Sequence, residues 1–139
     1  MSSTEQNKAV VRDLFENASQ GRFDVIGQFI TPDYVNHPDD VRGVEGLTAM
    51  VQEYRAALSN LKVTVEHQFA DGDYVATRTT VSGRHDGELM GAPATGREVA
   101  VSMLTISRCK DGKIEEEWEI IDAVSLLQQV GALPEPATA

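Results

Sequence analysis

The stretch VAVSMLTISRCKDGKIEEEWEIID, residues 99–122, alternates apolar and polar side chains on both sides of Asp111-Gly112. Alternation with a period of two is typical of a β-strand with one buried face, and Asp-Gly favours the two-residue turn of a β-hairpin. Counting outward from this turn pairs Val101 with Asp122. The sequence therefore predicts an antiparallel hairpin whose register decides which side chains share a face.

This register sorts the side chains of the hairpin onto two faces. The face expected to line the interior carries Val101, Met103, Ile114, Trp118, Ile120 and Asp122. The opposite face carries Glu115, Glu117 and Glu119 together with the apolar Leu104, Ile106 and Ile121. The sequence supplies no further helix to cover these apolar side chains, and exposed apolar patches of this kind mark interfaces. We therefore expect a homodimer through the outer face of the sheet.

The preceding part of the chain supplies a second hairpin and several helices. Residues 61–69 alternate in the same way, and the turn at Asp71-Gly72 places Arg78 opposite Val65 on the apolar face. Apolar spacing predicts helices within 2–20, 23–30, 47–58 and 123–130, with a loop over 33–42. Helices followed by a largely antiparallel sheet predict an α+β fold, with the helices on one concave face and a cavity between the layers.

Length and charge limit what the chain can be. With 139 residues, we expect one domain over residues 1–139 with frayed tails at about 1–4 and 134–139. The net charge of -10 would repel a phosphate backbone, which argues against a nucleic-acid partner. No apolar run approaches the roughly 20 residues that a membrane span needs. We therefore expect no membrane partner and a cytoplasmic location.

The sequence carries no motif for a metal, a disulfide or a nucleotide. Cys109 is the only cysteine, and His37, His67 and His85 are too widely spaced to form a metal motif. The glycine-rich stretch 83–97 matches neither a P-loop nor a dinucleotide fingerprint. We therefore expect no metal and no cofactor, no role for the thiol, and a core position for His67 in its strand.

Asp122 is the residue whose predicted position is most informative. The register places its carboxylate among apolar side chains, where desolvation would raise its pKa and suit it to general acid/base catalysis. Asp directly before a helix is also a favoured N-cap, and residues 123–130 are expected to be helical. Both interpretations fit the pattern equally well.

Other polar residues have two interpretations as well. Arg78 on the apolar face needs a partner, and Glu116 is the candidate; the pair could be purely structural or could help to orient Asp122 or a substrate atom. His37 and His85 lie in segments that could reach a ligand or could simply be solvated.

Several longer stretches resemble a known family. GDYVATR (72–78), SGRHDGELMGAPATGREV (82–99), DGKIEEEWEIID (111–122) and LLQQVGALP (126–134), with NHP at 36–38, follow the order and spacing of SnoaL-like polyketide cyclases. These belong to the wider fold group of nuclear transport factor two and ketosteroid isomerase. The resemblance implies a cone-shaped α+β barrel, usually dimeric, around an apolar pocket.

The resemblance also implies a function. Characterised cyclases of this family close a polyketide ring by intramolecular aldol condensation with an aspartate as acid/base, and that aspartate matches Asp122. A hydrophobic small-molecule substrate is implied. Placement and resemblance together predict a pocket lined or covered by Tyr34, His37, Tyr54, His85 and Trp118, with Arg78 as a further substrate contact. The alternatives are a non-catalytic binding domain, or a hydratase, isomerase or hydroxylase of the same fold.

Overall fold

The computed structural model describes residues 3–134. The elements are α1 (Thr4–Ser19), the 3-10 helix η1 (Phe23–Gln28), β1 (Ile30–His37), β2 (Val41–Arg42), α2 (Gly43–Ala57), β3 (Leu58–Asp71), β4 (Tyr74–His85), β5 (Glu98–Lys110), β6 (Lys113–Ile121) and α3 (Ala123–Gln129). Six strands form one curved sheet in the order β2-β1-β6-β5-β4-β3. Only β1 and β6 pair in parallel within the described residues. The expected α+β fold with a curved, mostly antiparallel sheet is confirmed.

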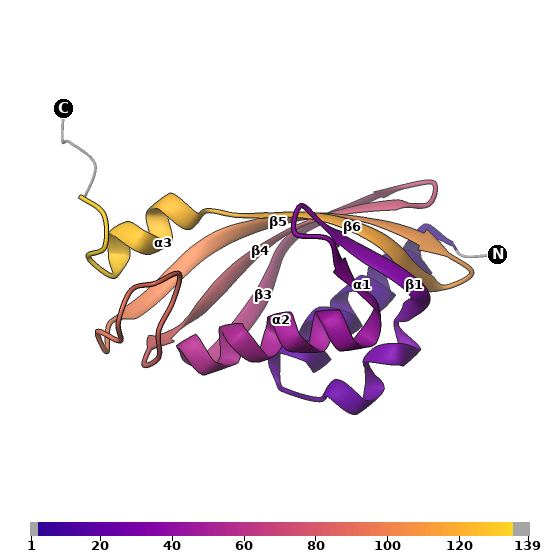
Figure 1. Ribbon diagram of the computed structural model, residues 1–139. Coiled ribbons are helices and arrows are strands. Elements are labelled where there is room, and N and C mark those ends of the chain that lie inside the picture. The colour runs from indigo at the N-terminus through magenta and orange to yellow at the C-terminus, as the bar shows by residue number, and fades with distance from the viewer. Residues whose placement is uncertain (1–2, 135–139) are drawn as a thin grey trace.

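The helices that precede β3 lie on one side of the sheet. Figure 1 shows α1, η1 and α2 packed beneath the curve of the strands, while α3 extends from the end of β6. The same view shows the opposite, convex side without a helix over it, as far as residues 3–134 are concerned. The concave side of the sheet and the three N-terminal elements therefore enclose the interior.

Helix α1 begins with a capping box. The Ser3 side chain accepts a hydrogen bond from the Gln6 backbone, and the Gln6 side chain accepts one from the Ser3 backbone, at 3.1 and 3.0 Å. These two bonds satisfy backbone donors that a helix N-terminus otherwise leaves free. Ser3 and Thr4, which were expected to lie in a frayed tail, form the cap and the first residue of α1. Residues 1, 2 and 135–139 of the predicted tails lie outside the described residues.

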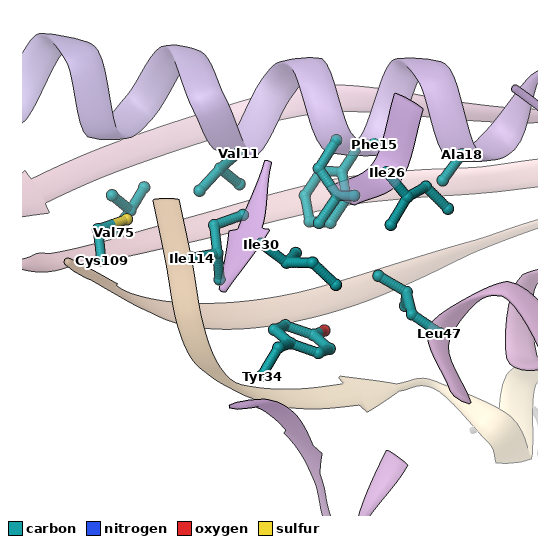
Figure 2. Packing of buried hydrophobic residues seen from close by; sticks show 11 residues of the cluster. Val11, Phe15, Ala18, Ile26, Ile30, Tyr34, Leu47, Val75, Cys109 and Ile114 are labelled. Carbon is teal, nitrogen blue, oxygen red and sulfur yellow. The ribbon is translucent and has the colours of Figure 1, made fainter. Parts of the chain in front are cut away.

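Two apolar clusters fill the space between the layers. The first joins α1 to η1, β1 and the ends of β4–β6 nearest the turns, and Figure 2 shows Val11, Phe15 and Ile26 meeting Ile114 and Tyr34 there. The second lies around β4, β5 and α3, with Leu58, Val81, Val101, Leu126 and Val130 as members. The space between these clusters is where the cavity lies.

The β5–β6 hairpin has the predicted turn, but not the predicted register along its whole length. Cys109 pairs with Ile114, as counted from the turn, whereas Arg108 pairs with Glu116 and Met103 with Ile121. Glu115 is therefore an extra residue, and this β-bulge shifts every later pair by one position. Because side chains alternate, a shift of one residue exchanges the two faces of β6 beyond the bulge. Glu117, Glu119 and Ile121 consequently lie inside, and Trp118 and Ile120 lie outside.

The β3–β4 hairpin also differs in register from the prediction. Asp71 pairs with Tyr74 and His67 with Arg78, so the turn lies one residue later than expected. His67 is exposed rather than a core histidine, and Arg78 donates from Nε to its Nδ1 at 3.1 Å. The predicted position of Arg78 on the interior face is therefore wrong.

Strands β1 and β2 are the elements of the sheet that the sequence pattern did not indicate. The stretch 33–42, expected to be a loop, contains most of β1 and the short β2. Pro32 and the polar Asp33 interrupt the apolar pattern, and β1 pairs with β6 through an irregular register between Ile30 and Val35. Irregular pairing of this kind leaves no clean alternation in the sequence.

Candidate functional site

A cavity lies between the concave sheet face and helices α1 and α2. Its walls are mostly apolar, with Leu14 and Phe15 from α1, Met50 from α2, Val63 from β3 and Met103 from β5. The polar side chains that line it are Ser19, Asn36, Tyr54, Glu117 and Glu119, and no lining residue is cationic. A mostly apolar lining with a few polar side chains at one end is typical of a small-molecule site.

Glu117 is held in the wall of the cavity. Its side chain is 1% exposed, and both of its oxygens accept hydrogen bonds, from the Tyr34 hydroxyl at 2.6 Å and from the Ser107 hydroxyl at 2.5 Å. Burial, and then the nearby charge of Glu119, raise the pKa of Glu117 to about 7. The two hydroxyl donors oppose that rise only in part.

Glu119 lies two residues further along β6 and on the same face. Its Oε2 accepts a hydrogen bond from the Thr105 hydroxyl at 3.0 Å, and the Asn36 side chain also binds it. Desolvation by the apolar walls raises the pKa of this carboxyl above its usual value. Glu119 is partly accessible where Glu117 is fully enclosed, so it is the carboxyl that a ligand in the cavity can reach.

Two residues of β1 complete the polar end of the cavity. The Asn36 amide donates to the Tyr34 hydroxyl at 3.1 Å, and that hydroxyl donates to Glu117. Tyr34 is fully buried, and its burial together with the Glu117 charge raises its pKa well above the usual value. Tyr34 therefore acts as a neutral donor in the wall, while Asn36 lines the cavity itself.

This arrangement can move a proton without a metal ion. A carboxyl with a raised pKa, held by fixed donors in an apolar cavity, can take a proton from a substrate carbon and return it to an oxygen. Among residues 3–134, no three His, Cys, Asp or Glu side chains are grouped to hold a metal. The same residues contain no helix long and apolar enough to cross a membrane.

Asp122 lies outside this arrangement. Its carboxylate accepts a hydrogen bond from the Ser125 backbone at 3.1 Å as the N-cap of α3, and its side chain is exposed. Asp122 does not line the cavity. The prediction that its strand register turns it into the interior is wrong, because the Glu115 bulge lies between the turn and Asp122. The helix-cap interpretation describes its position.

His37 and Trp118 lie on the convex side and not in the pocket. Their rings stack with centroids 5.7 Å apart, and His37 Nε2 lies 2.7 Å from the Glu116 carboxylate. Glu116 also accepts a hydrogen bond from Arg108 at 2.9 Å, so Arg108 and His37 take the place that was predicted for Arg78. The expected pocket contacts of His37, Trp118 and Arg78 are corrected accordingly.

The remaining predicted residues lie on the interior side. Tyr54 lines the cavity, and burial together with the charge of Glu119 raises the pKa of its hydroxyl. Tyr34 lies behind the cavity wall, bonded to Glu117. His85 is fully buried and its Nδ1 lies 2.9 Å from the Thr95 hydroxyl, but it does not line the cavity.

Sequence reasoning missed the residues that form the polar end of the cavity. Glu117 and Glu119 were assigned to the solvated outer face, and Asn36 was noted only as part of the NHP motif. The signal for the two glutamates was the unbroken run Glu115-Glu116-Glu117, because three like residues in a row interrupt the alternation and can mark a bulge.

Known proteins share this fold and much of this sequence. The family model of SnoaL-like polyketide cyclases matches residues 8–130. The chain belongs to the SnoaL-like polyketide cyclase family. It is 30% identical over 128 residues to the aklanonic acid methyl ester cyclase DnrD of Streptomyces peucetius, covering 88% of each chain. It is 29% identical over 116 residues to the nogalonic acid methyl ester cyclase of Streptomyces nogalater, covering 80% of this chain and 87% of that one.

Solved structures superpose closely on this chain. TsrD of Streptomyces laurentii matches with a TM-score of 0.88 at 26% identity, over 96% of this chain and all of that one. IdmH of Streptomyces antibioticus matches with a TM-score of 0.79 at 34% identity, over 91% of this chain and 99% of that one. The family predicted from the sequence motifs is therefore confirmed, and the relatives support a cyclase-like function.

Proposed function

We propose that this SnoaL-like protein closes a ring in a hydrophobic polyketide by an intramolecular aldol reaction, with Glu119 as the acid/base. The observation that supports this proposal is the placement of the Glu119 carboxyl in an apolar cavity, within reach of a ligand and hydrogen-bonded by Thr105. The resemblance implied the same role for Asp122, which caps α3 outside the cavity. The geometry supports Glu119.

The reaction needs only a proton carrier and a shaped pocket. Glu119 removes a proton from the carbon next to a substrate carbonyl, and the conjugated system spreads the resulting negative charge. That carbon forms a bond to a second carbonyl carbon held nearby, and the protonated Glu119 returns its proton to the new alkoxide oxygen. The product is an isomer of the substrate. The cavity walls supply proximity, which can be the largest part of the rate gain for an intramolecular step.

The charge of the cavity favours an uncharged substrate. Glu117 and Glu119 line it and no cationic side chain does, so a free carboxylate would be repelled. The relatives in Streptomyces are named for the methyl esters of aklanonic and nogalonic acids. We propose that the substrate of this chain likewise carries its carboxyl group as an ester.

The test compares Glu119→Gln with Asp122→Asn, using aklanonic acid methyl ester as the probe and chromatography to separate the isomeric product. Loss of the acid/base in Glu119→Gln should lower turnover by about 10²- to 10⁴-fold. Asp122→Asn should keep turnover near that of the unsubstituted protein, because Asn also caps helices well.

Two results would contradict this assignment. An inactive Asp122→Asn protein that folds normally, beside an active Glu119→Gln protein, would return the catalytic role to Asp122. Saturable binding of the ester without turnover in the unsubstituted protein would favour a non-catalytic binding domain.

We further propose that a second copy of this chain covers the convex face. That face exposes six large apolar side chains: Phe69, Tyr74, Leu104, Ile106, Trp118 and Ile120. Five of them are 47% or more exposed to solvent, and Trp118 is 38% exposed. Several of them line one groove. Ile121, which was expected on this face, lies inside, and the exposed Trp118 and Ile120 enlarge the patch. A two-fold axis would let the patch cover itself.

A further inference from the structure

The interior carries two carboxyl groups where the proposed reaction uses one. Glu117 and Glu119 project from the same face of β6 into the same apolar surroundings, and Glu117 has no direct role in the ring closure. A buried carboxylate is costly to ionise, and a second one beside it adds the repulsion of like charges. Two full negative charges at this position would need cationic partners.

The groups that face the pair provide no such partner. They are Tyr34 from β1 and Tyr54 from α2, with the thiol of Cys109 on β5 under the influence of the Glu117 charge. The side chains that α1, β3 and β4 contribute to the cavity are uncharged: Leu14, Phe15, Ala18, Ser19, Leu61, Val63 and Val81. The pair must therefore reduce its charge by keeping a proton.

The hydrogen bonds distinguish the two carboxyls. Glu117 has each oxygen occupied, by Tyr34 and by Ser107, and is almost fully buried in the cavity wall. Its position is fixed, and it cannot approach a substrate carbon without breaking both bonds. Glu119 accepts hydrogen bonds from Thr105 and Asn36, but it is less buried than Glu117 and lines the cavity. One carboxyl is therefore anchored in the wall while the other remains available for chemistry.

We propose that Glu117 is a positioning residue that shares a single proton with Glu119, so that the pair carries one negative charge at neutral pH. This inference rests on the proposed function in so far as the shared proton serves the reaction. The singly charged pair can take up the substrate proton at Glu119 and later release it to the alkoxide. With the shared proton on Glu117, Glu119 is the ionised member, and its apolar surroundings make it a stronger base than a solvated carboxylate would be.

The sharing can be measured in the free protein by carbon NMR of the glutamate side-chain carboxyls during a pH titration. In the unsubstituted protein, Glu117 and Glu119 should titrate in two coupled steps, the upper one near or above neutral pH. In Glu117→Gln, Glu119 should titrate in one step, at least one pH unit below that upper step. Glu116→Gln, on the other face of the same strand, is the matched control and should leave both steps unchanged.

The titration tests the shared proton and the turnover tests the proposed function, so either proposal can fail without the other. If Glu119 titrates at the same pH with and without the Glu117 carboxyl, the two groups are independent and the shared proton is ruled out, whatever the activity. If the steps are coupled but the protein has no cyclase activity, the proposed function fails and the proton pair stands. In an active protein, Glu117→Gln should shift the pH profile of kcat along the pH axis and leave KM nearly unchanged.

A second variant covers the case in which Glu117→Gln does not fold. Ser107→Ala removes one of the two donors that stabilise the ionised form of Glu117 and changes no cavity-lining residue. It should move the upper step to higher pH. An unchanged or lowered upper step in this variant would overturn the proposal.

Discussion

Neighbouring glutamates on β6 have opposite chemistry because they lie on opposite faces of one sheet. On the convex face, Arg108 and His37 bind Glu116 and hold the pKa of its carboxyl below the usual value. On the concave face, burial raises the pKa of the adjacent Glu117 to about 7. The residue type is the same and the chain positions are consecutive. The face alone decides whether a glutamate is a surface ion-pair partner or a buried carboxyl with a raised pKa.

The two faces also differ in their apolar content, in a way that runs against the simplest expectation. The large side chains Trp118 and Ile120 are exposed, while the cavity receives the carboxyls of Glu117 and Glu119. The apolar convex face is consistent with the proposed assembly with a second copy. The acidic, apolar-walled cavity on the concave face is consistent with a small-molecule ligand. The bulge at Glu115 sets which residues serve which surface.

The largest expected effect comes from moving that bulge. One alanine inserted between Glu116 and Glu117 would exchange the faces of the remaining strand and direct Trp118 into the cavity. We expect this protein to lose cooperative unfolding. Deleting Glu115 should instead remove the bulge and leave every later pair as it is, at a stability cost of about 1–2 kcal/mol. Near-ultraviolet circular dichroism and thermal melts distinguish the two.

The pair of variants tests the comparison directly, since both change the length of β6 by one residue. If the insertion folds with normal stability and the deletion does not, the faces are not set by the extra residue at Glu115. If both fold equally well, the sheet tolerates either register, and the opposite environments of Glu116 and Glu117 do not arise from the bulge.

The sequence predicted local structure well and register poorly. The Asp111-Gly112 turn and the antiparallel pairing of the strands on either side of it follow from short-range rules that tertiary contacts did not override. The bulge depends on contacts between strands, including the hydrogen bonds of Arg108 to Glu115 and Glu116 at 3.0 and 2.9 Å. Counting from a turn cannot detect an inserted residue, so every face assignment beyond it was reversed.

Most errors in the site follow from that single residue and from β1, whereas Arg78 was misplaced because the turn of the β3–β4 hairpin lies one residue later than expected. Because the predicted faces were reversed, Trp118 was predicted to line the pocket in place of Glu119. For the same reason, Asp122 was predicted to face the interior, which it does not reach. Asn36 and Tyr34 could not be placed beside Glu117, because the parallel pairing of β1 with β6 joins residues about 80 positions apart. The family, in contrast, could be predicted, since its motifs are compared without any assumption about register.

The second effect concerns assembly on the convex face. Ile106→Asp places a carboxylate at a position that is 47% exposed in one chain and would be enclosed in the proposed dimer. The monomer should keep its stability, while the dissociation constant of the dimer rises at least about 100-fold, or about 3 kcal/mol. Val124→Asp on α3, 59% exposed, is the matched control and should not change it. Light scattering at micromolar concentration shows a dimer that only Ile106→Asp disrupts; a monomeric unsubstituted protein contradicts the proposal.

The smallest effect separates the two kinds of glutamate by the pH dependence of unfolding. The pKa of Glu117 is raised from 4.5 to about 7 in the folded protein. Between pH 4.5 and about 7, Glu117 therefore takes up a proton when the chain folds. The contribution of Glu117 to the free energy of unfolding is therefore complete below pH 4.5 and decreases as the pH rises toward 7, by at most about 3 kcal/mol. Glu117→Gln, which resembles the protonated form, should match the unsubstituted protein at pH 5 and be more stable at pH 8.

Glu116→Gln should behave in the opposite way in the same denaturant titrations. Because the pKa of Glu116 is lowered, its contribution is present above its unfolded pKa and is lost as the pH falls through the lower folded value. Its carboxylate is solvated, so the loss should be small and screened by salt. The net charge of -10 adds repulsion at high pH in every protein of the set. Subtracting the free energy of unfolding of the unsubstituted protein from that of each variant at the same pH cancels most of this shared contribution. Parallel stability curves for all three proteins would show that the face of β6 does not determine how its glutamates ionise.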